Sequence, residues 1–370
     1  MKKSLLKSVE HGVKRIVFGL SQIHLKKGRT EFQTVDPDSV RRVLFIRPEK
    51  LGDMVISLPV FHNLKTRYPH LELYTISSPR NIAIVQNNEH IKQNFLYTKN
   101  IVRDLGMLRS VRSLRVDAVV DMVCDDSVTA LFLTQYSSRN AWRIGVGKNR
   151  HRTYYDFNYE YRTGDEAHVV DNTLRLLTAF GIDCDSAEKY VPPTIPDRFF
   201  QSADEYIASL NGDAPGGIIG VNISAGRPTR VWQNEKTTEL IHRLLVTYPS
   251  QRIIISSDPK ERDRAVALAK SFGTRVDPLP PGLNLLEVAA VISRMKLLIT
   301  PDTSLVHIAR SFKVPVVGLY TRFQKNFTLW RPYGQLSGAV VSGNDYNIFD
   351  IEVDDVYTTA IGLLPPEDTP

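Results

Sequence analysis

Residues 41–59, RRVLFIRPEKLGDMVISLP, hold the first sign of the fold. Residues 41–47 have an apolar centre, which predicts a buried strand, and residues 53–68 predict a helix. A short loop that contains Gly52 and Asp53 joins them. A strand that passes through a tight loop into a helix is the unit from which parallel α/β sheets are built.

The same alternation continues along most of the chain. Further strands are predicted at residues 71–76, 117–123, 141–146, 217–223, 252–256, 296–300 and 314–320, mostly with helical segments between them. Residues 190–197 contain three prolines and interrupt the pattern. The α/β chain is therefore predicted to form two doubly wound Rossmann-like domains that face each other across a cleft. The predicted parts are 41–191, a linker at 192–198, 199–345, and a C-terminal segment at 346–370.

Length and composition agree with this division. The 370 residues suit two domains of roughly 150–200 residues each. Only Cys124 and Cys184 are present, which gives neither a disulfide framework nor a paired-cysteine zinc site and suits a reducing cytoplasm. The net charge of +7 lies entirely in residues 1–30, where eight basic residues face one acidic residue. The remainder of the chain is neutral, so nucleic acid is not an expected partner.

Residues 1–40 are predicted to be a basic amphipathic arm. Its apolar residues recur at helical spacing, at Leu5, Val9, Val13, Ile16, Leu20 and Ile23. The longest apolar run is too short to span a bilayer, and no cleavage site of a signal peptide follows it. Two interpretations remain open: a helix on an anionic membrane surface, and a helix that packs on the body.

Two common nucleotide-binding motifs are missing from the sequence. No strand is followed by GxGxxG, which disfavours a dinucleotide oxidoreductase, and no GxxxxGK[ST] occurs, which disfavours a P-loop kinase. Residues 145–148, GVGK, match neither motif and are interpreted as a turn.

Three loops at predicted strand ends carry the chemistry. In the first, Asp53 is either a general base aimed into the cleft or a helix cap. In the second, small residues allow backbone N–H groups to approach phosphate oxygens, and Arg230 supplies charge; the small residues are Ser224, Ala225 and Gly226. In the third, Asp302, Thr303 and Ser304 open a helix whose free N–H groups attract anions, with His307 one turn later. Ordinary capping and core packing would explain each loop taken alone.

Taken together, the loops resemble glycosyltransferase family 9, the bacterial lipopolysaccharide heptosyltransferases. The resemblance covers residues 41–340 and rests on Gly-Asp at 52–53, a basic residue two positions before Trp232, and Asp-Thr-Ser-Leu-Val-His at 302–307. Two positions depart from the family pattern: Ser304 replaces a glycine, and Arg230 stands where lysine is frequent. The N-terminal arm lies outside the pattern.

The resemblance implies a GT-B architecture and an inverting, metal-independent transfer without a cofactor. The N-terminal domain would bind a lipid-linked saccharide acceptor, with Asp53 as base and Lys50 as a contact. The C-terminal domain would bind a nucleotide sugar, ADP-heptose in this family, through the second and third loops; Asp258 is added as a contact to ribose or base. Because such an acceptor is linked to lipid, the resemblance also implies that the enzyme acts at the cytoplasmic face of the inner membrane.

Three alternatives remain open at this stage. They are a family member that uses another nucleotide sugar, a non-catalytic protein that binds nucleotide sugars, and a GT-B-like epimerase. Asp53 speaks against the second, because binding alone requires no base in the acceptor half.

Overall fold

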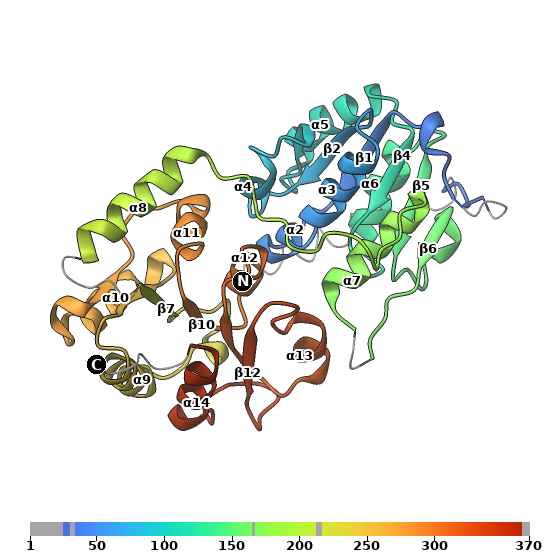
Figure 1. Ribbon diagram of the computed structural model, residues 1–370. Helices are drawn as coiled ribbons and strands as arrows, with labels where there is room; N and C mark the ends of the chain where they lie inside the picture. Colours follow the sequence, from blue (N-terminus) through green and yellow to red (C-terminus); the bar gives the residue numbers. More distant parts are fainter. Residues whose placement is uncertain (1–24, 30–33, 165–166, 212–216, 365–370) are drawn as a thin grey trace.

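The computed structural model describes residues 25–29, 34–164, 167–211 and 217–364. They form two six-stranded sheets in which every strand pair is parallel. The sheets have the orders β3-β2-β1-β4-β5-β6 and β12-β11-β10-β7-β8-β9, so each repeats the order of the doubly wound nucleotide-binding fold. Figure 1 shows them as two lobes, and the predicted α/β architecture is confirmed.

The first sheet and its helices span residues 42 to 180. Its elements are β1 (Arg42–Ile46), α2 (Leu51–Val55), α3 (Leu58–Arg67), β2 (Glu72–Ser77), α4 (Ile82–Val85), β3 (Ile91–Leu96), α5 (Ile101–Ser113), β4 (Ala118–Asp121), α6 (Val128–Ser137), β5 (Trp142–Val146), β6 (Phe157–Tyr159), α7 (Val169–Leu174) and the 3₁₀ helix η3 (Arg175–Phe180).

The second sheet and its helices follow an extended stretch that contains Pro192, Pro193 and Pro196. Its elements are α8 (Asp197–Asn211), β7 (Ile218–Asn222), the 3₁₀ helix η4 (Pro228–Arg230), α9 (Asn234–Thr247), β8 (Arg252–Ser256), α10 (Arg262–Lys270), β9 (Val276–Pro278), α11 (Leu285–Ile292), β10 (Leu297–Pro301), α12 (Ser304–Ser311), β11 (Val316–Tyr320), α13 (Gln324–Trp330), β12 (Ser337–Val341) and α14 (Val353–Leu363). Helix α8 begins inside the segment predicted as linker.

The central strands are mainly apolar because both of their faces are covered. In β1, Val43 and Phe45 face the core cluster shared with α2 and α3, whereas Leu44 and Ile46 face the cluster shared with α5. Successive side chains of a strand point to opposite faces, so a strand buried on both sides needs a continuous apolar run.

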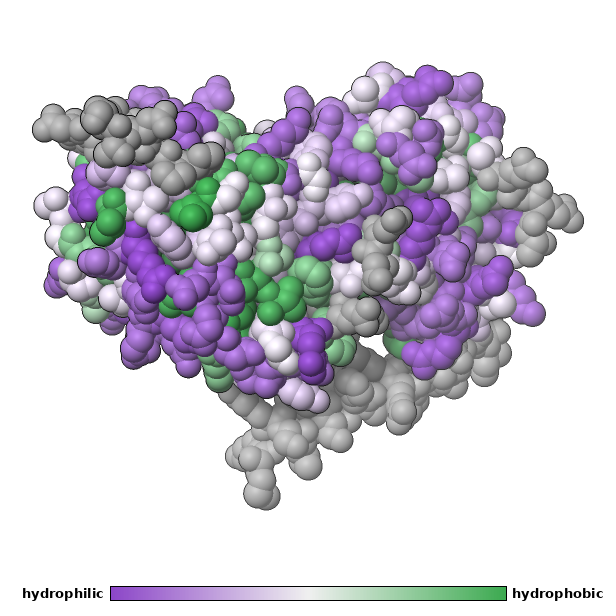
Figure 2. Space-filling view, turned by 60° about the horizontal axis from the view of Figure 1, so that its bottom comes forward, coloured by the Kyte–Doolittle hydropathy of each residue, from purple (hydrophilic) through white to green (hydrophobic). Residues whose placement is uncertain are grey.

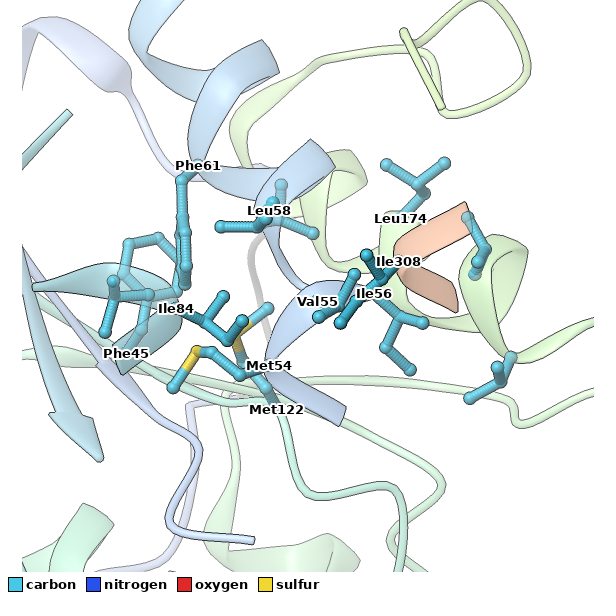
Figure 3. Packing of buried hydrophobic residues seen from close by; sticks show 14 of the residues in the cluster. Phe45, Met54, Val55, Ile56, Leu58, Phe61, Ile84, Met122, Leu174 and Ile308 are labelled. Atoms are coloured by element: carbon cyan, nitrogen blue, oxygen red, sulfur yellow. The ribbon is translucent and has the colours of Figure 1, made fainter. Parts of the chain in front are cut away.

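One hydrophobic cluster connects the two halves. It contains Val55 and Ile56 from the first half and Ile308 from α12 of the second. Figure 3 shows these side chains next to each other, with Leu174 of α7 beside them. The halves therefore share apolar packing on the sides where α2 and α12 lie.

The helix predicted at residues 53–68 is two helices in the structure. Helix α2 ends at Val55, and α3 begins at Leu58 with Pro59 as its second residue. A proline in mid-helix lacks the N–H group and clashes with the carbonyl four residues earlier, so one continuous helix would be broken here.

Residues 25–29 pack on the first half. The Arg29 side chain lies over the Trp142 ring at 3.8 Å and pairs with Asp156 at 3.3 Å. The Lys26 carbonyl accepts from the Arg143 guanidinium. The apolar seam of the predicted arm, residues 5–23, lies outside the described residues.

The surface gives a second view of the two halves. In Figure 2 the face turned up from the bottom of Figure 1 is mainly hydrophilic over the first half, on the right, and carries hydrophobic patches over the second half. Of the helices described, none combines the length and the hydrophobicity that crossing a bilayer requires.

Candidate active site

Helices α2 and α12 lie against each other where the two halves meet (Figure 1). Gly52 forms a close approach: a Cβ atom there would lie 3.1 Å from Cδ2 of His307 and 3.6 Å from Cα of Ser304. Gly52 lies inside α2, with no left-handed backbone, so a tight turn is not the reason for it. Glycine is favoured here because a side chain would push the two helices apart.

Asp53 is the third residue of α2, and its carboxylate is held at both oxygens. Oδ2 accepts from the backbone N–H of Lys50 at 3.0 Å, and Oδ1 lies 3.7 Å from Nη2 of Arg47. Asp53 therefore does cap the helix in part, because its hydrogen bond with the Lys50 N–H closes the first turn of α2. The same contacts fix the carboxylate beside the contact with α12.

Arg47 organises this loop from the interior. Its side chain is almost fully buried, and it donates to the carbonyls of Asp53, at 3.1 Å, and of Met122. The Glu49 carboxylate lies 3.0 Å from its Nη1. Burial opposes the charge of Arg47, but Glu49 and Asp53 outweigh it and raise the Arg47 pKa. One buried cation thus joins two carboxylates.

Glu49 has an unusual acidity. Burial raises its pKa to about 7, Arg47 acts in the opposite direction, and the neighbouring charges of Asp53, Asp125 and Asp121 add to the rise. Such perturbed carboxyl groups concentrate at functional sites.

A cavity of about 440 Å³ opens beside Glu49 at the carboxyl edge of the first sheet. It is lined by residues that follow β1, β3, β4 and β5: Pro48, Glu49, Tyr97, Lys99, Val123, Asp125, Asp126, Ser127, Thr129 and Arg150. The lining is polar and carries both signs of charge, which suits a hydroxyl-rich ligand.

Lys148, in the segment interpreted as a turn, is one of the most deeply buried charges. Its Nζ lies 2.9 Å from the Asp121 carboxylate and donates to the carbonyls of Val123 and Asp125. The Tyr155 hydroxyl donates to the same carboxylate. Lys148 therefore ties down the segment after β4 that forms one wall of the cavity.

In the second half, hydrogen bonds connect the loops that follow β7, β8 and β10 at the carboxyl edge of the sheet. Asn222 at the end of β7 donates to the Thr300 hydroxyl at 2.9 Å and to the Ser224 carbonyl at 3.1 Å. The Ser224 hydroxyl accepts from the backbone N–H of Asp258 at 2.8 Å. The loops after β7, β8 and β10 thus form one surface, as the sequence predicted for Ser224, Asp258 and Thr303.

The next residues of the β7 loop leave room for a ligand. Ala225 is half-buried and Gly226 is exposed, and a Cβ atom at Gly226 would meet nothing within 4 Å. The Asp258 side chain is also exposed.

Arg230 and Asp302 form an ion pair at this surface. Burial raises the pKa of Asp302, while the positive charges of Arg230 and Lys50 act against the rise. Lys50 belongs to the first half, so its charge reaches across to the second. The pair links the second and third predicted loops.

The start of α12 is only partly capped. The Thr303 hydroxyl accepts from the Leu305 N–H at 3.3 Å, and Ser304 opens the helix. The end of a helix that carries unpaired N–H groups attracts anions.

His307 lies deeper than its place in the predicted donor site suggests. Its ring is buried, packs edge-on to Trp330 at 5.5 Å between centroids, and leaves Nδ1 without a partner among the described residues. Burial, with a contribution from Arg310, lowers its pKa to about 3. His307 is therefore neutral and supports the contact with Gly52; a contact with the donor stays a prediction.

The structure brings the predicted residues together in two groups and adds some that the sequence analysis missed. Lys50 and Asp53 lie on the first-half side of the α2–α12 contact. The predicted donor-binding residues other than His307 lie on the second-half side; they are Ser224, Ala225, Gly226, Arg230, Asp258, Asp302, Thr303 and Ser304. Arg47, Glu49, Asp121 and Lys148 were missed. For Arg47 and Asp121 the available signal was a charged residue at the end of an apolar strand, which is costly to bury unless it is paired. Glu49 and Lys148 lie in the loops beyond β1 and β5. Within the described ranges, no three His, Cys, Asp or Glu side chains group as a metal site requires.

Comparison with known proteins identifies the family. The model of glycosyltransferase family 9 (heptosyltransferase) matches residues 105–357. The chain belongs to this family. It is therefore a glycosyltransferase. The match includes the loops of the second half and not Asp53, which lies before it.

Individual relatives of this glycosyltransferase are distant but nearly full-length. It is 22% identical over 300 residues to lipopolysaccharide heptosyltransferase 3 of Escherichia coli, which covers 76% of this chain and 83% of that protein. A family 9 structure from Veillonella parvula has a TM-score of 0.74 at 18% identity, over 90% of this chain and 99% of that one. The E. coli heptosyltransferase WaaC with ADP-2-deoxy-2-fluoro heptose has a TM-score of 0.67 at 18% identity, over 87% and 99%. These structures confirm the GT-B fold.

Proposed function

We propose that this chain is an inverting heptosyltransferase that moves heptose from ADP-heptose to a saccharide of the lipopolysaccharide core. The relative from E. coli is named for lipopolysaccharide, and WaaC was solved with an ADP-heptose analogue. The observation that carries the proposal is the contact between α2 and α12, because it sets Asp53 next to the start of the helix that would face the donor.

Asp53 acts as the general base. Arg47 and the Lys50 N–H hold its carboxylate in one position, and its oxygens can accept a proton. Asp53 takes the proton of an acceptor hydroxyl while that oxygen attacks the anomeric carbon of the donor. The bond from that carbon to the diphosphate breaks on the opposite side, so the configuration inverts.

The second half stabilises the departing diphosphate. Arg230 and the free N–H groups at the start of α12 place positive charge where the leaving group gains negative charge. Arg230 is paired with Asp302, and donor binding would exchange part of that pair for phosphate. Ser224, Ala225, Gly226 and Asp258 hold the remainder of the nucleotide.

The acceptor saccharide occupies the cavity beside Glu49. Its mixed carboxylate, hydroxyl and basic lining matches sugar hydroxyl groups, and Glu49 shares Arg47 with the base. Lys50, whose charge also acts on Asp302, contacts the acceptor. Because the acceptor is linked to lipid, the reaction would take place at the cytoplasmic face of the inner membrane.

An assay of heptose transfer tests the proposed function. The purified chain is incubated with ADP-heptose and a delipidated core saccharide, and the product is analysed by mass spectrometry and by NMR of the new anomeric centre. We expect one added heptose with inverted configuration, also in the presence of a chelator. Retained configuration, or activity that disappears with chelator and returns with a divalent ion, would contradict the mechanism.

The same assay separates the alternatives when GDP- and UDP-sugars replace ADP-heptose. Faster transfer from one of them identifies a different donor. Tight nucleotide binding without product from any donor indicates a non-catalytic protein, and a changed sugar without acceptor indicates an epimerase.

A further inference from the structure

Three exposed aliphatic side chains lie on α5 and α6, whose first residues follow the carboxyl ends of β3 and β4. Val102 on α5 is 81% exposed, Leu105 on α5 is 46% exposed, and Val128 at the start of α6 is 44% exposed. Single exposed aliphatic residues are common on protein surfaces. Val102 and Leu105 lie three residues apart in the first two turns of α5, and Val128 opens α6. The two helices contact each other and cover the same face of the sheet. We call Val102, Leu105 and Val128 the α5 apolar patch.

Basic residues accompany the patch along α5. Arg103, Arg109 and Arg112 are exposed on α5. The acidic residue of this helix, Asp104, points inward, where it accepts from the backbone N–H and the hydroxyl of Thr98 at 2.8 and 2.9 Å. The outward face of α5 is therefore apolar at its beginning and cationic along its length.

The patch adjoins the cavity proposed for the acceptor. Tyr97 and Lys99, just before α5, line that cavity, and so do Ser127 and Thr129 on either side of Val128. Helix α5 covers the face of the sheet opposite to the cluster shared with the second half, so donor-side elements do not obstruct this surface.

We propose that the α5 apolar patch and its arginines dock on an anionic lipid surface. Aliphatic side chains enter the boundary between headgroups and acyl chains, while arginines pair with the anionic headgroups, which is the pattern of interfacial helices. Docking there turns the cavity toward lipid-linked saccharides. The purpose of the docking rests on the proposed function, whereas lipid binding itself can be measured without any sugar.

The first experiment uses the full chain and vesicles of phosphatidylglycerol and phosphatidylcholine. Val102→Asp/Leu105→Asp is compared with Val246→Asp on α9 of the second half, a control that is also highly exposed, at 69%. We expect the double variant to weaken binding by about tenfold or more, and the control to bind like the original chain. Equal binding by both variants would overturn the proposal.

The second experiment locates the contact independently of the basic N-terminal residues. Val102→Trp and Val246→Trp are each titrated with the same vesicles containing brominated lipid, after subtraction of the emission of the original chain. We expect a blue shift and quenching for tryptophan at 102 and neither change at 246. A tryptophan at 102 that stays in water while the protein sediments with vesicles would assign binding elsewhere. Capture of a protein partner without any lipid response would likewise contradict the proposal.

A third measurement keeps the two proposals apart. Turnover on the delipidated saccharide should be the same for Val102→Asp/Leu105→Asp and the original chain, because the patch lies outside the reacting groups. Lost transfer by the original chain with retained vesicle binding would refute the proposed function alone.

Discussion

The two halves have the same strand order, but different kinds of chemical group form the carboxyl edges of their sheets, where the proposed site lies. The first half uses buried charges that are paired inside the protein: Arg47 with Asp53 and Glu49, and Lys148 with Asp121. The second half uses small side chains, hydroxyl groups and a helix start, with one ion pair near the surface. The first half contains the proposed base and the second the proposed diphosphate site.

This difference reflects two chemical tasks. A base must hold one geometry, and buried pairs fix geometry because any rearrangement would leave an uncompensated charge. A diphosphate is recognised by N–H groups that the backbone already presents, so the second half needs space and an available cation more than buried charge. The predictions below test that division, beginning with the largest effect.

Asp53→Asn tests the first half as the source of the base. The amide keeps the size of the side chain but cannot accept a proton, so turnover should fall by about 10²–10⁴-fold. ADP affinity, measured by calorimetry, should be nearly unchanged because the nucleotide binds the other half. A variant with almost full turnover would show that Asp53 serves only the first turn of α2.

Lys148→Met tests whether buried pairs hold the first half rigid. It leaves the Asp121 carboxylate buried without its cation, which should lower the free energy of unfolding by about 3 kcal/mol. Urea titration measures the change, and adding Asp121→Asn should recover part of it. A loss below about 1 kcal/mol would mean that water replaces the lysine easily.

Arg230→Ala tests the second half as the diphosphate site. Loss of one charge-assisted contact should raise the KM for the donor about ten- to a hundredfold. Because the substitution also leaves Asp302 unpaired, Arg230→Ala/Asp302→Asn is the matched variant, and Arg230→Lys should restore part of the affinity. An unchanged KM in all three would assign the phosphate to other groups.

Glu49→Gln tests how much the clustered carboxylates of the first half lower the free energy of unfolding. Glu49 has a pKa of about 7 in the folded protein against an ordinary 4.5, so the folded state keeps a proton that the unfolded chain has released. The free energy of unfolding therefore falls as pH rises between these values. Glutamine cannot ionise, and the variant should be more stable at pH 8 by about 1 kcal/mol, with little difference at pH 4.5. Thermal unfolding at both pH values gives the answer; equal differences at both would contradict the shift.

The central strands of both sheets were predicted from the sequence, and the edge strands were missed. All eight predicted strands are present, from β1 to β11, and most of their residues are buried. The four missed strands, β3, β6, β9 and β12, are the outer strands of the two sheets. An outer strand is partly solvated, so residues such as those of β3, IKQNFL, carry no continuous apolar run.

Periodicity and residue order along the chain were sufficient to predict the fold class, the family and the loops that hold Asp53, Arg230 and Asp302. The roles of Gly52, His307 and Lys148 depend instead on packing between distant parts of the chain. Gly52 and His307 are 255 positions apart and meet because α2 packs on α12. Lys148 is buried because the Asp121 carboxylate at the end of β4 and two carbonyls from the segment after it surround its ammonium group. Contacts of this kind are set by how sheets and helices pack in space, and no local pattern of residues records them.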